Sequence, residues 1–530
     1  MLLTFVSSLA MVHPEPPSAD LWKLAQANAR LLRISTLIDA HQVTRLCGTD
    51  AGVQRAVAWC KDHGITHVYV ESYRDGHEPS EADLVRTRDA FRRAGFLVSG
   101  CITPTRIGKL SGGWGGVSCY TNARTRSEVQ RIFRRAALLF DEIMIDDFLF
   151  TDCTCAECAA ARGSRSWAQY RCDLLLDVSR KDILGTVRAA NARCKVIVKF
   201  PCWHEDFQER GYDVARQTEL YDKTWVGTET RGGVPGSGWA AEPQYRAYWL
   251  MRWLGGMGGP KCGGGWYDWL GTTPVYYLEQ ARLTILGGAR EAMLFNMGAL
   301  MEDRLGQRDI AAWREELPRH FQLARLIAGK TPRGLLGWKP PSSPPDGDRN
   351  LHPLLGMAGF PVTAAHRFQP SALGFVFGEQ VRADAAWRTA WETAVRSGRP
   401  VLVSAGLAPD LNVRAQGNVM VLPANRNPNV YEALSAMPEA ELNALRDRAT
   451  AGLGLSFHAP YGVGIWLFGS DIVVLQSFRD TPTQCVLSLA GARSFRAELT
   501  LPASASIPVQ PGPTTRLTLP PRSMIVLKRV

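Results

Sequence analysis

The chain has 530 residues, of which 45% are apolar and 21% are charged, as is ordinary for a globular protein. This length predicts two to four domains with large cores that need no disulfide support. The net charge of +11 comes from scattered arginines without a basic run, and no segment has the length of an apolar membrane span. We therefore expect neither a nucleic-acid partner nor a membrane partner.

Residues 1–28 are expected to form an N-terminal extension. Its apolar run has about the length of the core of a secretion signal, but no basic residue precedes it and no clean cleavage site follows it. The twelve cysteines are not spaced like a disulfide framework, and three of them have metal-ligand spacing. The sequence therefore favours a cytoplasmic protein, with a periplasmic or secreted location as the alternative.

Residues 29–335 alternate short β-like runs with amphipathic helical stretches. Eight candidate strands occur, at residues 31–41, 65–76, 95–104, 140–148, 194–204, 221–232, 260–271 and 289–300. Strand–helix alternation repeated eight times predicts a (β/α)8 TIM barrel. A doubly wound sheet is the alternative, but no glycine-rich phosphate-binding motif follows the first strand.

The rest of the chain predicts further domains. The proline-rich stretch 336–350 predicts a linker. Residues 351–452 combine short strands with helices, which indicates a small α/β domain. Residues 453–530 show short strands with period-2 alternation and regular turn signals, which predict a C-terminal β-sandwich.

Polar and aromatic side chains gather at the C-terminal ends of the predicted barrel strands. Barrel active sites are built at this end, and a purely structural barrel has no need to collect carboxylates and indoles there. The pattern therefore predicts an enzyme. The candidates for substrate binding are His41, Glu71, Arg74, Lys199, Trp203, His204, Arg231, Trp266, Tyr267 and Asn296.

Four carboxylates are candidates for the chemistry. Glycoside hydrolysis needs two carboxyl groups flanking one bond, and the aromatic rings at the mouth suit stacking on sugars. Asp146 and Asp147 end the fourth strand, and since side chains alternate along a strand, we expect only Asp147 to point into the mouth. Asp146 would then hold its neighbours by hydrogen bonds. The partner of Asp147 is either Glu229, after the sixth strand, or Asp268, after glycines in the seventh.

A Cys-x-Cys-x-x-Cys cluster follows the acid pair. It places three thiols on one tight loop, at Cys153, Cys155 and Cys158. Four thiolates close a tetrahedral structural zinc site. Cys119 is the best candidate for the fourth ligand, with Cys101 and Cys202 in reserve, because the loops after strands three and four are neighbours on a barrel. We expect structural zinc and no catalytic cofactor; unpaired loop cysteines or a disulfide are the alternatives.

The region around these cysteines resembles the zinc loop of the family 42 β-galactosidases. The cluster is followed by an Arg and a Trp in "AAARGSRSWAQY", and "SCYTN" at Cys119 is similar to that family's segment for the fourth cysteine. The segment "YLEQARLTILGGAREAMLFNMGAL" looks like its eighth helix and strand. The domain order is also similar: a barrel, a glutamine-amidotransferase-like trimerisation domain and a small β-domain. The resemblance implies a glycoside, oligosaccharide or polysaccharide substrate and a trimeric or dimeric assembly.

The chain departs from that family at the catalytic positions. The family has an Asn-Glu pair after strand four and a Glu nucleophile after strand seven, where this chain has Asp146-Asp147 and Asp268. The carry-over makes Asp147 the acid/base and Asp268 the nucleophile, and the shorter side chains suit inversion. A placement that resembles the α-galactosidase clan instead makes the strand-four Asp the nucleophile and Glu229 the acid.

Two other functional classes compete with a glycoside hydrolase. A non-catalytic carbohydrate-binding barrel would show stacking aromatics without two carboxyl groups facing one cavity. A metal-dependent barrel hydrolase would carry a His-x-His pair on its first strand, but His41 stands alone in "DAHQV".

Overall fold

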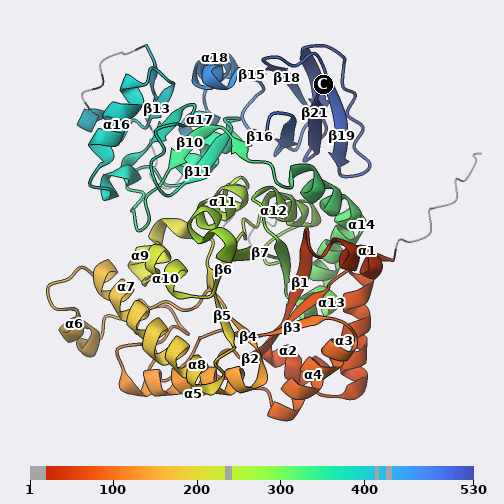
Figure 1. The fold of residues 1–530 in the computed structure, drawn as a ribbon, viewed down its shortest axis with the longest axis vertical. Helices are drawn as coiled ribbons and strands as arrows, with labels where there is room; N and C mark the ends of the chain where they lie inside the picture. The colour runs from red at the N-terminus through yellow and green to blue at the C-terminus, as the bar shows by residue number, and fades with distance from the viewer. Residues whose placement is uncertain (1–19, 233–241, 412, 414–416, 425–431) are drawn as a thin grey trace, which may run out of the picture.

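A computed structural model of the chain describes residues 20–232, 242–411, 413, 417–424 and 432–530. Most of the predicted N-terminal extension lies outside these residues. The first part is a closed barrel of eight strands in chain order, which confirms the predicted (β/α)8 fold (Figure 1). Its strands are β1 (Arg33–Ile38), β2 (His67–Tyr73), β3 (Leu97–Ile102), β4 (Glu142–Ile145), β5 (Lys195–Phe200), β6 (Lys223–Gly227), β7 (Cys262–Asp268) and β8 (Glu291–Phe295).

Amphipathic helices cover the outside of the barrel. In α5 (Ala123–Leu139) the buried side chains recur at helical spacing, and the side chain of Asn122 caps the first turn by accepting backbone N–H groups. The other helices of this part are α1 (Leu21–Asn28), α2 (Ala40–Cys47), α3 (Asp50–Asp62), α4 (Glu81–Arg93), α6 (Ala156–Arg162), α7 (Trp167–Val178), α8 (Thr186–Ala190), α9 (Phe207–Arg210), α10 (Val214–Leu220), α11 (Arg246–Gly258), α12 (Pro274–Leu286), α13 (Met297–Glu302) and α14 (Arg304–Ile327). Within the described ranges, none of the helices has the length and apolarity to cross a bilayer.

Each barrel strand contributes one side chain to a buried cluster inside the barrel. The cluster consists of Leu37, Tyr69, Cys101, Met144, Ile197, Trp225, Trp266 and Met293. The barrel interior is therefore packed, with the acid cluster at its mouth. A separate buried pair, His67 and Glu291 at 2.8 Å, lies at the opposite, N-terminal ends of β2 and β8. Because Trp266 points inward, its neighbour Tyr267 points outward, where its hydroxyl accepts a 2.9 Å hydrogen bond from the indole of Trp313 on α14. This alternation corrects the expectation that Tyr267 faces the mouth.

The second part is an α/β unit around a five-stranded parallel sheet in the order β11-β10-β12-β13-β14. Its strands are β10 (Leu335–Trp338), β11 (Val362–Ala365), β12 (Phe375–Phe377), β13 (Val401–Val403) and β14 (Val419–Val421), and its helices are α15 (Leu351–Met357), α16 (Trp387–Arg396), α17 (Glu432–Ser435) and α18 (Glu439–Thr450). The predicted linker 336–350 needs a correction. Its first residues belong to β10, an inner strand of the sheet, because their apolar side chains are buried there.

The C-terminal part is a β-sandwich of a three-stranded sheet, β15-β18-β20, and a five-stranded sheet, β19-β21-β17-β16-β9. Its strands are β9 (Pro332–Arg333), β15 (Leu455–His458), β16 (Val463–Phe468), β17 (Ile472–Ser477), β18 (Thr483–Leu489), β19 (Phe495–Leu501), β20 (Thr514–Leu519) and β21 (Met524–Arg529). The edge strand β9 precedes the α/β unit in sequence, so the sandwich takes one strand from outside 453–530. Figure 1 shows both C-terminal units on the side of the barrel that carries α11, α12 and α14.

Candidate active site

A cavity of about 710 Å³ lies at the C-terminal ends of the barrel strands. It is lined by predicted site residues from several strands: Arg74, Asp146, Asp147, Lys199, Trp203, Glu229, Arg231, Trp266 and Asp268. It is also lined by residues that the sequence analysis did not propose for catalysis or substrate binding: Trp114, Phe148, Phe150, Cys202, Asp206, Glu209, Arg210, Leu270 and Phe295. Two aromatic residues directly after the acid pair, and a tryptophan in a glycine-rich loop, were the available sequence signals for part of this second set.

The ammonium group of Lys199, near the end of β5, joins three carboxylates. Its Nζ lies 2.8 Å from Asp147 Oδ2, 2.9 Å from Glu229 Oε1 and 3.4 Å from Asp146 Oδ1. The same nitrogen lies 3.9 Å from the ring centroid of Trp266, so a cation–π contact also stabilises the ammonium group. Burial disfavours the charged form, but the three carboxylates outweigh burial and raise the pKa of Lys199 above its usual range. Lys199 is thus a permanent counter-charge within the acid cluster.

This shared ammonium limits the distance between two of the candidate catalytic groups. Oδ2 of Asp147 and Oε1 of Glu229 bind the same nitrogen at 2.8 and 2.9 Å, so they are at most about 5.7 Å apart. Carboxyl separations of about 5–5.5 Å are typical of retaining glycosidases, and about 6.5–9.5 Å of inverting ones.

A second network holds Asp146 in place. Arg74 donates to Asp146 Oδ2 at 2.9 Å and to both carboxylate oxygens of Glu71, and Thr103 donates to Glu71 and, at 3.0 Å, to Asp146. The backbone N–H of Asp147 donates to Asp146 Oδ1 at 2.8 Å. The expectation that only one of the two acids faces the mouth is corrected. Strand β4 ends at Ile145, so strand alternation no longer separates them.

The two adjacent acids have opposite pKa shifts. Burial works against ionisation of Asp146, but Lys199 and Arg74 outweigh it and hold the pKa of Asp146 below its usual range. Burial raises the pKa of Asp147 to about 7; the negative charges of Asp146 and Glu229 act in the same direction, and Lys199 opposes them. A carboxyl group with such a pKa gains and loses a proton readily at neutral pH, as a general acid/base requires.

Glu229 follows β6 on a segment pinned to β7. The N–H and hydroxyl groups of Thr228 both donate to the carbonyl oxygen of Trp266, at 2.7 and 3.0 Å. A Cβ at Gly227 would collide with the Glu229 carboxylate and with the backbone at Cys202, so glycine is required there. Oε2 of Glu229 is buried and accepts no hydrogen bond from the described residues. Lys199 therefore binds one oxygen of this carboxylate, and the other oxygen has no hydrogen-bond donor among the described residues.

Asp268, at the end of β7, has a different environment. Arg231 donates to both of its oxygens, with Nη2–Oδ2 at 2.7 Å and Nε–Oδ1 at 3.2 Å. Burial raises the pKa of Asp268, and the charge of Arg231 opposes that rise. This bidentate pairing occupies both carboxylate oxygens, which favours a positioning role over nucleophilic attack.

Besides Tyr267, four predicted substrate-binding residues do not line the cavity. Glu71 is buried and holds Arg74. His204 is buried against Trp249, so it makes no contact with the cavity. His41 is exposed on α2 and stacks on His77. Asn296 caps α13 and accepts a 2.6 Å hydrogen bond from Gln42. In each case a neighbouring helix or side chain, which the strand pattern alone does not reveal, engages the polar group.

Cys119 joins the cysteine cluster, as the barrel geometry predicts. Together with Cys153, Cys155 and Cys158 it places four sulfur atoms within 4.8 Å of one another. The Sγ atom of Cys119 lies 3.8 Å from that of Cys155 and 3.5 Å from that of Cys158. A tetrahedral zinc with Zn–S bonds of about 2.3 Å has sulfur–sulfur edges of about 3.8 Å, so this donor set fits the metal.

The surroundings of the cluster favour the thiolate form of Cys155, whereas burial raises the pKa of Cys119 and of Cys158. A hydrogen bond from the backbone N–H of Cys158 lowers the pKa of Cys155 to about 6, and hydrogen bonds with the other cysteines contribute. Lys109 Nζ lies 3.5 Å from the same sulfur, and Thr121 Oγ1 lies 3.0 Å from Cys158 Sγ. These groups offset part of the negative charge that four thiolates bring to one cation.

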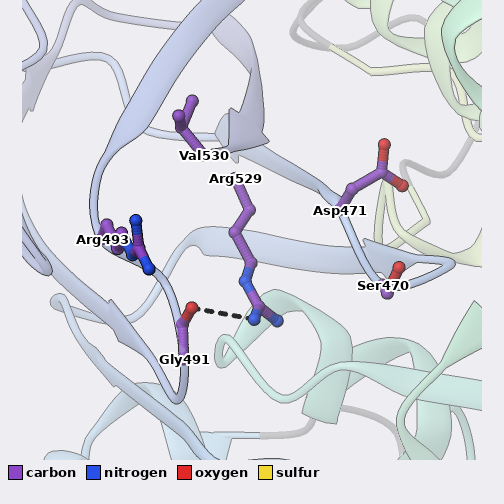
Figure 2. Close-up of a pocket in the computed structure, with 6 residues that line it drawn as sticks. All are labelled: Ser470, Asp471, Gly491, Arg493, Arg529 and Val530. Atoms are coloured by element: carbon purple, nitrogen blue, oxygen red, sulfur yellow. Dashed lines mark hydrogen bonds between the residues drawn. The ribbon is translucent and has the colours of Figure 1, made fainter.

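A second hollow lies on the β-sandwich, near the last strand, and Figure 2 shows its lining. The guanidinium of Arg529 crosses it and donates to the carbonyl oxygen of Gly491 at 2.8 Å. Its acidic residue, Asp471, is paired with Lys330 at 2.6 Å. The described lining thus contains no second carboxylate side chain that could act with Asp471.

The barrel, its mouth cavity and its cluster of carboxylates define an α/β-barrel protein of the glycosidase type. The chain belongs to the family described as probable glycosyl hydrolase, catalytic domain, which matches residues 19–334. A curated relative, an uncharacterized protein of Saccharolobus solfataricus, is 25% identical over 309 residues, covering 50% of each protein. The chain therefore spans about half the length of that relative.

Solved structures with a similar fold include family 42 β-galactosidases. Gan42B gives a TM-score of 0.59 at 11% identity, covering 95% of this chain and 98% of that one. A catalytic mutant of Gan42B from G. stearothermophilus gives 0.60 at 10% identity, over 94% and 98%. The β-galactosidase from Rahnella sp. R3 gives 0.52 at 10% identity, over 94% and 98%. At these identities the likeness concerns the fold alone.

Proposed function

We propose that this protein is a retaining glycoside hydrolase that uses Asp147 as acid/base and Glu229 as nucleophile. One observation carries the proposal: a single ammonium group, that of Lys199, binds one oxygen of each carboxylate and limits the distance between those two oxygens to about 5.7 Å, which is below the separation typical of inverting enzymes. Both groups line the same cavity, as a catalytic pair must and as a non-catalytic binding barrel would not require.

The proposed reaction has two displacement steps. Glu229 attacks the anomeric carbon while the glycosidic C–O bond breaks, and Asp147 donates its proton to the departing oxygen. Asp147, now a carboxylate, then takes a proton from water, which attacks the same carbon and releases Glu229. The raised pKa of Asp147 supports this double use, because the group must carry a proton in the first step and lose it before the second.

The other side chains of the cluster have supporting roles in this proposal. Lys199 orients both carboxylates, and its charge occupies the position among the three acids where a metal-dependent hydrolase would hold a cation. Arg74 and Glu71 fix Asp146, which keeps a negative charge beside Asp147. Arg231 fixes Asp268 at the edge of the cavity.

We also propose that the four cysteines hold a structural zinc ion. The ligands would be Cys119 from the β3–α5 loop and Cys153, Cys155 and Cys158 from the segment after β4. A bound zinc would cross-link two loops beside the cavity and take no part in bond breaking. The expected trimeric or dimeric assembly, the sugar and the linkage stay predictions from the sequence.

The deciding experiment combines product stereochemistry with chemical rescue. Wild-type protein is first tested on a panel of p-nitrophenyl α- and β-glycosides, and the first-formed anomer is read by NMR; retention is expected. The Glu229→Ala and Asp147→Ala variants are then assayed with azide. We expect Glu229→Ala to give a glycosyl azide of inverted configuration and Asp147→Ala to give one of retained configuration.

The controls separate the role of Glu229 from that of Asp268. Asp268→Ala rescued by azide with inversion would transfer the nucleophile role to Asp268. Asp141→Asn is the matched control, because Asp141 is exposed beside the opposite end of β4 and pairs only loosely, at 3.6 Å, with Arg92. Inverted products from the wild-type enzyme would overturn the proposed mechanism, and no hydrolysis of any glycoside would overturn the function.

A further inference from the structure

Three aromatic rings stack on one another in the wall of the mouth cavity. The ring of Trp114 lies 5.6 Å from that of Phe148 and 5.9 Å from that of Phe150, with interplanar angles of 12° and 28°. Phe148 and Phe150 are 6.1 Å apart at 26°. All three line the cavity that holds the carboxylates, so these offset-stacked rings form one aromatic cluster in its wall, which we call the aromatic platform.

The outer member of the platform is held in an exposed position. Trp114 is 51% exposed although it is a large apolar side chain. Its backbone N–H donates to Asp152 Oδ2 at 2.7 Å, and the hydroxyl of Ser111 donates to Asp152 Oδ1 at 2.6 Å. A Cβ at Gly113 would collide with the same carboxylate, so the loop needs glycine there to approach Asp152. The loop is thus fixed by hydrogen bonds while its indole stays open to solvent.

Polar groups border the platform. Arg210 lines the same cavity, and its guanidinium donates to Asp152 at 3.1 Å while 41% of its side chain remains exposed. Asp206 and Glu209 line the cavity as well. The half-exposed indole of Trp114, with hydrogen-bonding groups near it in the same cavity, matches a pyranose ring, which has an apolar C–H face and hydroxyl groups around its rim. An exposed apolar patch that continues a catalytic cavity marks a ligand site.

The position of the platform indicates which part of a substrate it would bind. Phe148 directly follows Asp147 in the chain, and both side chains line the cavity. A general acid protonates the oxygen of the leaving group, so a ring bound on the side of Asp147 belongs to the leaving group.

We propose that Trp114, with Phe148 and Phe150 beside it, forms a binding subsite for the leaving-group sugar of an oligosaccharide or polysaccharide. The proposal rests on the proposed function, because it places the subsite relative to Asp147 as general acid. The protein would then require at least two linked sugar rings for full activity, and binding energy from the second ring would accelerate cleavage of the bond beside the first.

The test compares two substrates of the sugar that the glycoside panel identifies. The first is its glycosyl fluoride, whose one-atom leaving group cannot reach the platform. The second is a series of its di- to tetrasaccharides. For Trp114→Ala we expect kcat/KM on the oligosaccharides to fall at least tenfold and kcat/KM on the fluoride to stay within twofold. Trp114→Phe should keep most of the activity on oligosaccharides, because it retains an aromatic face.

Leu110→Ala is the matched control, because Leu110 is 45% exposed in the same loop but does not line the cavity. It should leave kcat/KM on both substrates within twofold. If Trp114→Ala lowers kcat/KM equally on both substrates, or on neither, the proposed subsite is wrong. Failure of the proposed function has a different signature, since the wild-type enzyme would then release no fluoride. Calorimetric titration of wild-type and Trp114→Ala with a fixed panel of glucose, galactose, mannose and xylose tetrasaccharides would still test the subsite, and equal affinities would overturn it.

Discussion

Two clusters of four side chains lie near the barrel mouth, and they are built in different ways. Lys199 and its three carboxylates come from the ends of β4, β5 and β6 or from the residues directly after them, and the cluster contains its own cation. The cysteine cluster comes from two loops, and its four sulfurs face one another with the ammonium of Lys109 at one side. The first cluster already contains a cation, whereas the second would need one to hold four thiolates together.

This difference suits a catalytic role for the Lys199 cluster and a structural role for the cysteine cluster. Groups at the ends of buried strands are held by the barrel itself, which suits a reaction that tolerates little movement. The cysteines instead tie together loops that the barrel does not hold. Asp152, directly before Cys153, binds the loop of Trp114 on the other side. The cysteine cluster is therefore expected to support the shape of the cavity wall, and the Lys199 cluster its reactivity.

The largest effect is expected from Lys199→Met. This change removes the charge that orients Asp147 and Glu229, so kcat/KM should fall about 10²–10³-fold, as for loss of one preorganised charged donor. Steady-state kinetics on the preferred aryl glycoside measures it. Lys195→Met, an exposed position on the same strand, should stay within twofold. A similar loss in both variants would mean that β5, and not the charge, is disturbed.

The same variant should lose stability in a pH-dependent way. Without the ammonium, three buried carboxylates lose their shared counter-charge and the pKa of Asp147, which burial already raises, rises further above that of the unfolded chain, so stability is lost as pH rises through the folded-state value. Breaking such buried pairs costs about 3–5 kcal/mol. We expect the difference between Lys199→Met and wild type in denaturant unfolding to approach this cost at pH 8 and to shrink at pH 5. A pH-independent difference would contradict the cluster as described.

The cysteine cluster should affect stability more than chemistry. Cys155→Ser should abolish stoichiometric zinc, measured by elemental analysis, and lower the Tm by about 5 °C, which corresponds to about 2 kcal/mol. Its kcat on a glycosyl fluoride should stay within a few-fold of wild type. Cys172→Ser, a buried cysteine that takes no part in the cluster, should keep the metal. If neither the wild-type protein nor Cys172→Ser binds zinc, the assignment of the metal is wrong.

The pH dependence of kcat/KM should report the ionisation of Asp147. Since burial raises its pKa to about 7 and the first step needs its proton, the rate should fall about tenfold per pH unit above pH 7. An aryl glycoside with a very acidic phenol should lose this basic limb in the bond-breaking step, because such a leaving group needs no proton. If the fall in rate above pH 7 persists with that substrate, a group other than Asp147 causes it.

The smallest effect is expected from Thr103→Val. It removes the hydroxyl that donates to Glu71 and Asp146 without changing a charge. Loss of hydrogen bonds of this kind costs about 1 kcal/mol, so kcat should fall about fivefold. The basic limb of the pH profile should keep its midpoint near that of wild type. Thr103→Ser, which keeps the hydroxyl, should restore the rate.

Much of the architecture could be predicted from the local sequence pattern. Strand–helix alternation indicated all eight barrel strands, and the spacing of the cysteines together with neighbouring barrel loops identified Cys119. The prediction failed where a side chain's direction depends on a neighbouring element. Tyr267 turns toward Trp313 on α14, and His204 is buried against Trp249 on α11.

The sequence by itself determined the barrel, the acids at its mouth and the four cysteines, because these follow from periodicity and from residue types at the ends of strands. Only the tertiary structure decided how the acids are paired. Lys199 meets Asp147 and Glu229, which are 52 and 30 positions away in the chain, because parallel strands bring their C-terminal ends together. The aromatic platform likewise depends on a hydrogen bond between distant loops, at Trp114 and Asp152. Such contacts arise from folding in three dimensions, so no local pattern records them.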